Sequence, residues 1–175
     1  MSKKMTSGVA FVLGGARSGK SVFAEQIIID SGLHPVYVAT AQVWDEEMRA
    51  RVDTHRARRD MRWQTVEEPN DLEAVIATEA IQGRALLVDC LTLWVTNLML
   101  AEAVMADRFA SLVAALRKAE GLIVLVSNEV GLGIVPDNKM ARDFRDHAGL
   151  LHQDIAAMAD QVHFVTAGLP MKLKG

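Results

Sequence analysis

The feature that most constrains this chain is a run of residues near its N-terminus that matches the pattern G-x-x-x-x-G-K-[ST] in full. The run consists of Gly14, Gly15, Ala16, Arg17, Ser18, Gly19, Lys20 and Ser21. In such a loop, small residues let backbone N–H groups close on phosphate oxygens, and the helix that follows adds partial positive charge. These residues are therefore predicted to bind the phosphates of a nucleotide.

The neighbouring sequence supplies the context that this motif requires. Val9–Leu13 is a continuous apolar run stopped by Gly14, which predicts a buried strand. Lys20–Asp30 carries apolar residues at helical spacing and ends at Ser31-Gly32, which predicts a helix. Strand, glycine loop and helix follow in that order, so an incidental turn is the weaker interpretation.

The same alternation continues to the C-terminus. Further strands are predicted at Val36–Ala39, Ala85–Val88, Leu122–Ser127 and Val162–Ala167. Further helices are predicted at residues 45–58, 70–80 with Asn70 as cap, 92–100, 106–119 and 139–160. Strands that alternate with helices form a mainly parallel sheet covered on both faces. The fold class is therefore α/β, a P-loop NTPase-like three-layer fold, and residues 1–175 are predicted to form one P-loop nucleotide-binding domain.

The bulk composition excludes several classes of protein. A net charge of -3 and a pI near 5.9 give no overall attraction to nucleic acid. A lone cysteine, Cys90, excludes an internal disulfide, and the longest apolar runs are too short for a membrane span. No charged leader with a cleavage signal opens the chain. We expect a cytoplasmic protein.

Two residues suggest how the nucleotide's metal is bound. Lys20 is expected to hold the β- and γ-phosphates, and Ser21 supplies a hydroxyl for Mg²⁺. The second protein ligand of the metal usually follows a neighbouring apolar strand, as Asp89 follows Ala85–Val88. The alternative is that Asp89 merely caps the next helix.

The motifs of a switch GTPase are missing. The sequence after Asp89 lacks the glycine of D-x-x-G, and Ala141 stands where N-K-x-D places its guanine-selecting carboxylate. Small-molecule kinases remain. A cluster of Arg51, His55, Arg58 and Arg59 lies near one face of a predicted helix end and suggests a second phosphate site. Cations that favour a helix C-terminus and face solvent are the alternative.

With these residues in hand, the chain resembles the bifunctional adenosylcobinamide kinase/adenosylcobinamide-phosphate guanylyltransferase family of the cobalamin pathway. The resemblance runs nearly end to end. It is carried by Gly14–Ser21 with the unusual Arg17, Val36–Ala41, Asp45–Met48 with Arg51, His55 and Arg56, Trp63–Pro69, Asp89–Thr92, Val95–Leu98 and Ser127–Pro136.

The resemblance implies that His55 attacks the α-phosphorus of GTP, expels pyrophosphate and carries GMP as a phosphoramidate. Neutral imidazole is well populated near neutral pH, which suits this role. The other nucleotide contacts that it implies are Ala39, Thr40, Ala41, Arg56, Ala57, Arg58, Arg59, Glu67 and Asp89. Glu68 is an alternative to Glu67. Ala41 and His152 depart from the residues expected of the family, serine in some members and asparagine.

The resemblance also implies the substrates. The hydroxyl of adenosylcobinamide's aminopropanol arm attacks a γ-phosphoryl group held by Lys20, Ser21 and Mg²⁺, with ATP and GTP as nucleotide substrates. No base for that hydroxyl is apparent from the sequence. The loop at residues 128–138 with Arg142, Arg145 and Asp146 shapes either the corrinoid side or a subunit contact, or serves only in capping and solvation. Family members are expected to be homo-oligomers, often trimers.

Three hypotheses stay open from the sequence. The first is the two-step enzyme, adenosylcobinamide kinase and guanylyltransferase. The second is a P-loop kinase for another small alcohol, in which His55 is incidental. The third is a nucleotide-dependent binding module or switch without catalysis, which the missing guanine-selecting carboxylate disfavours.

Overall fold

The computed structural model describes residues 4–42 and 61–175. The strands are β1 (Gly8–Gly14), β2 (His34–Ala39), β3 (Gln64–Glu67), β4 (Arg84–Asp89), β5 (Leu122–Asn128), β6 (Gln161–Thr166) and β7 (Leu169–Lys174). The helices are α1 (Lys20–Ser31), α3 (Leu72–Glu79), α4 (Leu91–Leu100), α5 (Met105–Lys118) and α6 (Lys139–Met158). The predicted helix at residues 45–58 lies outside the described residues.

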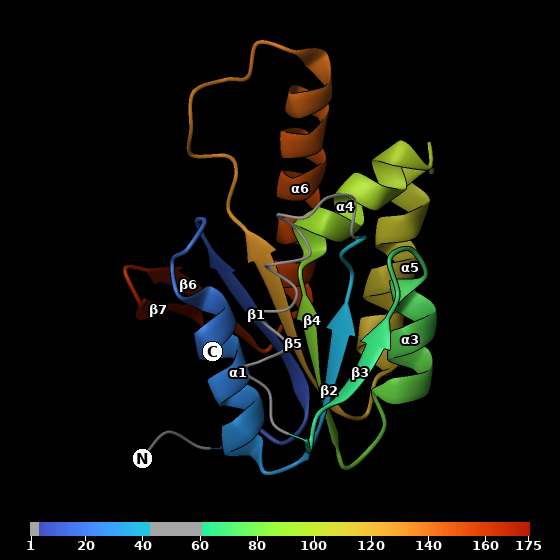
Figure 1. Ribbon diagram of the computed structural model, residues 1–175, viewed down its shortest axis with the longest axis vertical. Coiled ribbons are helices and arrows are strands. Elements are labelled where there is room, and N and C mark those ends of the chain that lie inside the picture. Colours follow the sequence, from blue (N-terminus) through green and yellow to red (C-terminus); the bar gives the residue numbers. More distant parts are fainter. Residues whose placement is uncertain (1–3, 43–60) are drawn as a thin grey trace.

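These strands form one seven-stranded sheet in the order β3-β2-β4-β5-β1-β6-β7. All neighbouring pairs are parallel except β6 and β7, which are antiparallel. Helix α1 packs on one face, and α3, α4, α5 and α6 form a layer on the other (Figure 1). The prediction of an α/β three-layer fold is confirmed.

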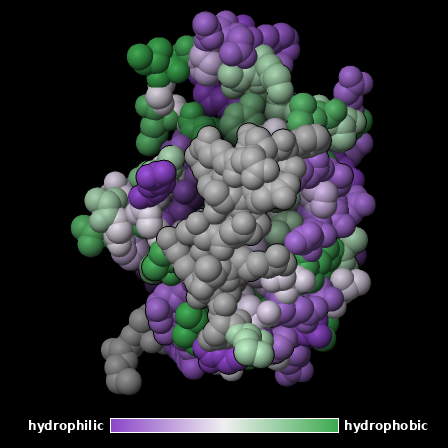
Figure 2. Space-filling view, viewed as in Figure 1, coloured by the Kyte–Doolittle hydropathy of each residue, from purple (hydrophilic) through white to green (hydrophobic). Residues whose placement is uncertain are grey.

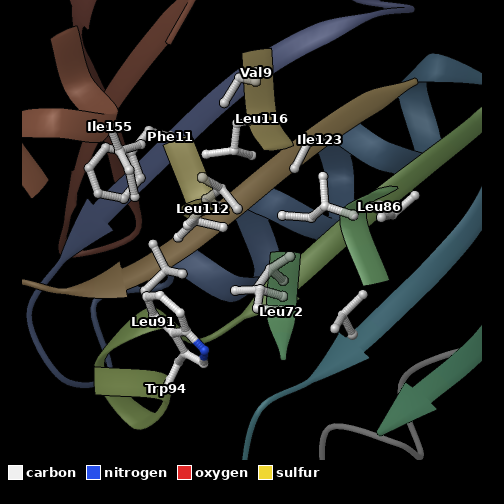
Figure 3. Packing of buried hydrophobic residues seen from close by; sticks show 14 of the residues in the cluster. Val9, Phe11, Leu72, Leu86, Leu91, Trp94, Leu112, Leu116, Ile123 and Ile155 are labelled. Carbon is white, nitrogen blue, oxygen red and sulfur yellow. The ribbon is translucent and has the colours of Figure 1, made fainter. Parts of the chain in front are cut away.

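The two faces of the central strand β1 show how the sequence builds these layers. Phe11 faces a core shared with Trp94 of α4, Leu112 of α5 and Ile155 of α6 (Figure 3). Its neighbour Val12 faces the opposite core, under α1. Because successive side chains of a strand alternate between faces, a strand covered on both sides must be apolar throughout.

Three sequence expectations need correction or extension. Helix α3 begins at Leu72, so the predicted Asn70 cap is wrong; the Glu68 carboxylate instead accepts the N–H groups of Asn70 and Asp71, both at 2.9 Å. Strands β3 and β7 were not predicted. β3 is polar and mostly exposed, and every residue of β7 is exposed, so neither has the apolar signal of a buried strand.

The segment between β5 and α6 projects beyond the carboxyl edge of the sheet together with the first turns of α6 (Figure 1). Asn138 caps α6 by accepting the Ala141 N–H at 2.8 Å, and Arg142 donates to the carbonyls of Pro136 and Asp137. Leu132 and Ile134 of this segment are exposed. Hydrophobic residues gather at the upper left of Figure 2, where Figure 1 places the segment. Within residues 4–42 and 61–175, no helix combines the length and apolarity of a membrane span.

Candidate nucleotide-binding site

The phosphate loop joins β1 to α1 at the carboxyl edge of the sheet and is fixed by the turn between β6 and β7. Gly168 donates its N–H to the Ser18 carbonyl at 2.8 Å. Gly19 has a φ of 96°, and a Cβ there would lie 3.1 Å from the Cα of Gly168. Only glycine combines this positive φ with so close an approach. The β6–β7 turn thus supports the loop from outside.

Two side chains of the phosphate loop are placed to bind an anion. Lys20 is buried, and its ammonium donates to the Gly15 carbonyl at 3.0 Å. Burial lowers the pKa of Lys20, while the negative charge of Asp89 opposes that shift. The Ser18 Oγ is buried and has no hydrogen-bond partner within the described part of the chain. A phosphate oxygen would satisfy that hydroxyl and pair with the ammonium.

Asp89 ends β4, and β5 lies between β4 and the P-loop strand β1. Two strand spacings of about 4.8 Å therefore separate β4 from β1. The register places Asp89 and Val12 level with the same residue, Val126. Since the charge of Asp89 affects the Lys20 ammonium, both groups belong to one electrostatic site.

Beyond Asp89, the ends of β2 and β3 bring together three of the residues predicted to contact guanine nucleotide. Ala39 pairs with Glu67 on one side and with Asp89 on the other. Ala39 and Ala41 are partly buried, and Glu67 is exposed. This group lies on the β4 side of the sheet, whereas the phosphate loop follows β1. His55, Arg56, Ala57, Arg58 and Arg59, together with Arg51, lie outside the described residues.

Thr40, by contrast, is fully buried. Its hydroxyl donates to the Cys90 carbonyl at 2.8 Å and accepts the Cys90 N–H at 2.9 Å, and its own carbonyl accepts from Asn97 at 2.8 Å. Because the hydroxyl is already used twice within the protein, its contribution to the site is to hold the end of β2 against β4.

The same polar network continues to β5. Asn128 donates to the Thr92 hydroxyl at 3.0 Å, and that hydroxyl lies 2.8 Å from the Cys90 sulfur. Burial, with a smaller contribution from Asp89, raises the pKa of Cys90, so this cysteine is a protonated thiol. The network fixes the carboxyl ends of β2, β4 and β5 relative to one another.

A cavity of about 440 Å³ opens beside the phosphate loop. Its lining combines Gly15–Ser18 with Glu129, Leu132 and the end of β6 at residues 164–167. Sequence reasoning did not single out Glu129 as a site residue. Glu129 could have been found as an acidic residue directly after the buried strand Leu122–Asn128. An acidic residue at the end of a buried strand is also the feature that identified Asp89.

The fold is shared with solved P-loop NTPase structures at low sequence identity. The flagellar accessory protein FlaH from Methanocaldococcus jannaschii aligns with a TM-score of 0.54 at 14% identity, covering 95% of this chain and 78% of that one. A prototypical ATPase from the type III secretion system of pathogenic bacteria aligns with a TM-score of 0.57 at 13% identity, covering 94% and 56%. These similarities show the P-loop NTPase-like fold alone.

Sequence relatives are much more similar. The bifunctional adenosylcobalamin biosynthesis protein CobP of Pseudomonas aeruginosa is 52% identical over 94% of this chain and 96% of its own length. The protein of the same description, CobU, of Salmonella typhimurium is 40% identical over 93% and 98%. Residues 10–173 match the sequence model of the cobinamide kinase / cobinamide phosphate guanyltransferase family. The chain belongs to that family.

Proposed function

We propose that this chain phosphorylates the aminopropanol hydroxyl of adenosylcobinamide and then transfers GMP from GTP to the new phosphate, giving adenosyl-GDP-cobinamide. The observation that carries the proposal is a complete phosphate loop with a buried Lys20 at the start of α1, in a chain of this family. Coverage of nearly the whole length of its relatives supports one domain for both activities.

In the kinase step, Lys20 and the loop N–H groups hold the β- and γ-phosphates. The Ser18 hydroxyl, which has no partner among the residues that the structure describes, adds a donor at the same place. The Ser21 hydroxyl and the Asp89 carboxylate are oxygen donors of the kind that Mg²⁺ prefers, and both belong to the loop and strand ends of this site. When bound, the metal neutralises charge that develops on the phosphates.

In the guanylyl step, the His55 imidazole attacks the α-phosphorus of GTP while the bond to pyrophosphate breaks. The phosphate of adenosylcobinamide phosphate then attacks the same phosphorus and releases His55. Arg56, Arg58 and Arg59 neutralise the triphosphate, with Ala57 beside them. Ala39, Ala41, Glu67 and Asp89 contact the guanine nucleotide, a role that the pairing of β2 with β3 and β4 supports.

A product assay tests both activities. Protein incubated with adenosylcobinamide, ATP, GTP and Mg²⁺ should yield the phosphate ester and then adenosyl-GDP-cobinamide, and neither should form without the protein. Lys20→Ala should slow formation of the ester by about 10²–10³-fold. His55→Ala should leave the ester and abolish the GDP product. A complete GDP product from His55→Ala would exclude the histidine intermediate.

The intermediate itself has a direct test. Incubation with α-labelled GTP should label the protein through a bond that acid cleaves and base does not, as expected of a phosphoramidate, and His55→Ala should remain unlabelled. An acid-stable label would exclude this chemistry.

We further propose that the protein works as a homo-oligomer in the cytoplasm, where its nucleoside triphosphate substrates are found. Exposed Leu132, Ile134 and Val135 on the projecting segment support association, because contiguous exposed apolar surface usually marks a contact. Light scattering coupled to size-exclusion chromatography measures the mass, and a trimer is the expected state. A monomer at micromolar concentration would exclude it.

A further inference from the structure

Glu129 is held beside the phosphate loop by the backbone. It directly follows β5, the strand between the P-loop strand β1 and the Asp89 strand β4. Its N–H donates to the carbonyl of Gly14, the first residue of the loop, at 3.0 Å. Its side chain lines the same cavity as Gly15–Ser18. A short, rigid connection therefore places a carboxylate at the mouth of the phosphate site.

The carboxylate is oriented by one main-chain donor. Its Oε1 accepts the Gly131 N–H at 2.5 Å, and a Cβ at position 131 would approach that oxygen to 3.0 Å. Glu129 is only partly buried, and it has no ion pair within 4.0 Å in the described part of the chain. The carboxylate thus keeps acceptor capacity for a ligand.

Two basic side chains lie in the surroundings of Glu129. Arg17 lines the same cavity. His152 of α6 senses the negative charge of Glu129, which raises the pKa of His152, but burial lowers that pKa more strongly and keeps the ring neutral. A carboxylate at this position, beside the phosphate loop, can accept a proton from a substrate.

Phosphorylation of an alcohol requires such an acceptor, because the hydroxyl must lose its proton as its oxygen bonds to phosphorus. Two other described acids are less suitable. Asp89 is assigned to the metal, and Glu67 ends β3, which β2, β4 and β5 separate from β1. Glu129 shares its cavity with the loop itself, and Leu132 and Phe164 give that cavity apolar walls for the alkyl part of the acceptor.

We propose that Glu129 is the general base of the kinase step and that the cavity beside the phosphate loop receives the hydroxyl-bearing arm of the acceptor. The hydroxyl proton passes to a carboxylate oxygen of Glu129 as the hydroxyl oxygen bonds to the γ-phosphorus. The bond from that phosphorus to the β–γ bridging oxygen breaks, and its electron pair leaves with the nucleoside diphosphate. This inference rests on the proposed kinase activity.

The test is Glu129→Gln, which keeps the side chain's size and an oxygen for the Gly131 N–H but removes the base. Steady-state kinetics with adenosylcobinamide and ATP should show kcat lowered by about 10²–10⁴-fold with KM for both substrates nearly unchanged. Glu129→Asp should recover part of the rate. Glu120→Gln is the matched control, because Glu120 is exposed at the opposite end of β5.

A second assay separates chemistry from folding. Guanylylation of separately prepared adenosylcobinamide phosphate by Glu129→Gln should proceed at the wild-type rate, with an unchanged melting temperature. Kinase kcat within about threefold of wild type would overturn the role of Glu129 and leave the proposed function standing. Parallel loss of both activities with a lowered melting temperature would show a structural role instead. A wild-type protein without kinase activity would remove the proposed function and this inference together.

Discussion

The Thr40 hydroxyl bonds to both main-chain polar groups of Cys90, donating to the carbonyl and accepting the N–H. The two residues follow the ends of β2 and β4, neighbouring parallel strands. One buried side chain therefore replaces the ladder hydrogen bonds at the point where the strands diverge toward the site. Removing this hydroxyl should lower both the free energy of unfolding and the rate of guanylyl transfer.

Thr40→Val keeps the shape of the side chain and leaves the Cys90 N–H and carbonyl unsatisfied in a buried place. The free energy of unfolding should fall by about 2–3 kcal/mol, measured by urea denaturation. Thr65→Val is the control, because Thr65 is exposed on β3 and should change stability by less than about 0.5 kcal/mol. An equal effect of both variants would contradict the assigned role of Thr40.

Lys20→Met removes the ammonium that lies inside the phosphate loop. Phosphorylation kcat/KM should fall by about 10²–10³-fold, since one preorganised cation no longer meets the charge of the transition state. The melting temperature should not fall, because the lost partner is a single neutral carbonyl. Lys139→Met, at an exposed position on α6, serves as control and should keep full activity. A destabilised Lys20→Met protein would show that the lysine supports the fold.

His152 makes stability depend on pH. Burial lowers its pKa in the folded protein below the ordinary 6.5, so the unfolded chain binds this proton at a higher pH. The free energy of unfolding should therefore be independent of this group above about pH 7 and fall as pH drops below about 6.5. Urea midpoints measured across that range test this.

The variant His152→Asn should show a shallower fall over the same range. His163, whose pKa is lowered by burial and by Lys172, should account for part of the remaining slope. An unchanged pH dependence in His152→Asn would show that the folded protein binds the His152 proton as readily as the unfolded chain.

Gly19→Ala should damage the phosphate loop. Its positive φ disfavours a side chain, and the new methyl group would press on Gly168. We expect the free energy of unfolding to fall by about 1–3 kcal/mol. Nucleotide binding, measured by titration calorimetry, should no longer be detectable. Gly149→Ala is the opposite case, because Gly149 lies within α6 with nothing within 4 Å of the added Cβ. It should raise stability by about 0.5–1 kcal/mol.

The sequence predicted the structure best where buried residues follow a simple pattern of apolar side chains. The run Val9–Leu13 and the glycine motif after it predicted β1, the loop and α1 closely, because a strand covered on both faces must be apolar and the loop requires glycine. Strand β7 has no such constraint. Its six residues are exposed, and it pairs antiparallel with β6 after a turn at Ala167 and Gly168, both of which have positive φ.

The functional residues divide in the same way. Lys20 and Asp89 are predictable because a local motif or a strand end gives their place. The burial of Thr40 and the closeness of Glu129 to Gly14 depend on which strands are neighbours in the sheet. Local sequence does not predict this strand order. The pairing of Ser127 with His152 at 2.7 Å is of this kind, joining β5 to α6 within the core.

The place of β1 in the sheet has a consequence for synthesis on the ribosome. The strand emerges before the other strands of the sheet, but both of its neighbours, β5 and β6, are synthesised only after β2, β3 and β4. A nascent chain that stops before Gln161 lacks β6 and the Gly168 bond that fixes Ser18. Nucleotide capture therefore has to await the synthesis of β6 and of the turn after it, and until then the apolar strand β1 lacks at least one of its neighbours, a state that favours aggregation.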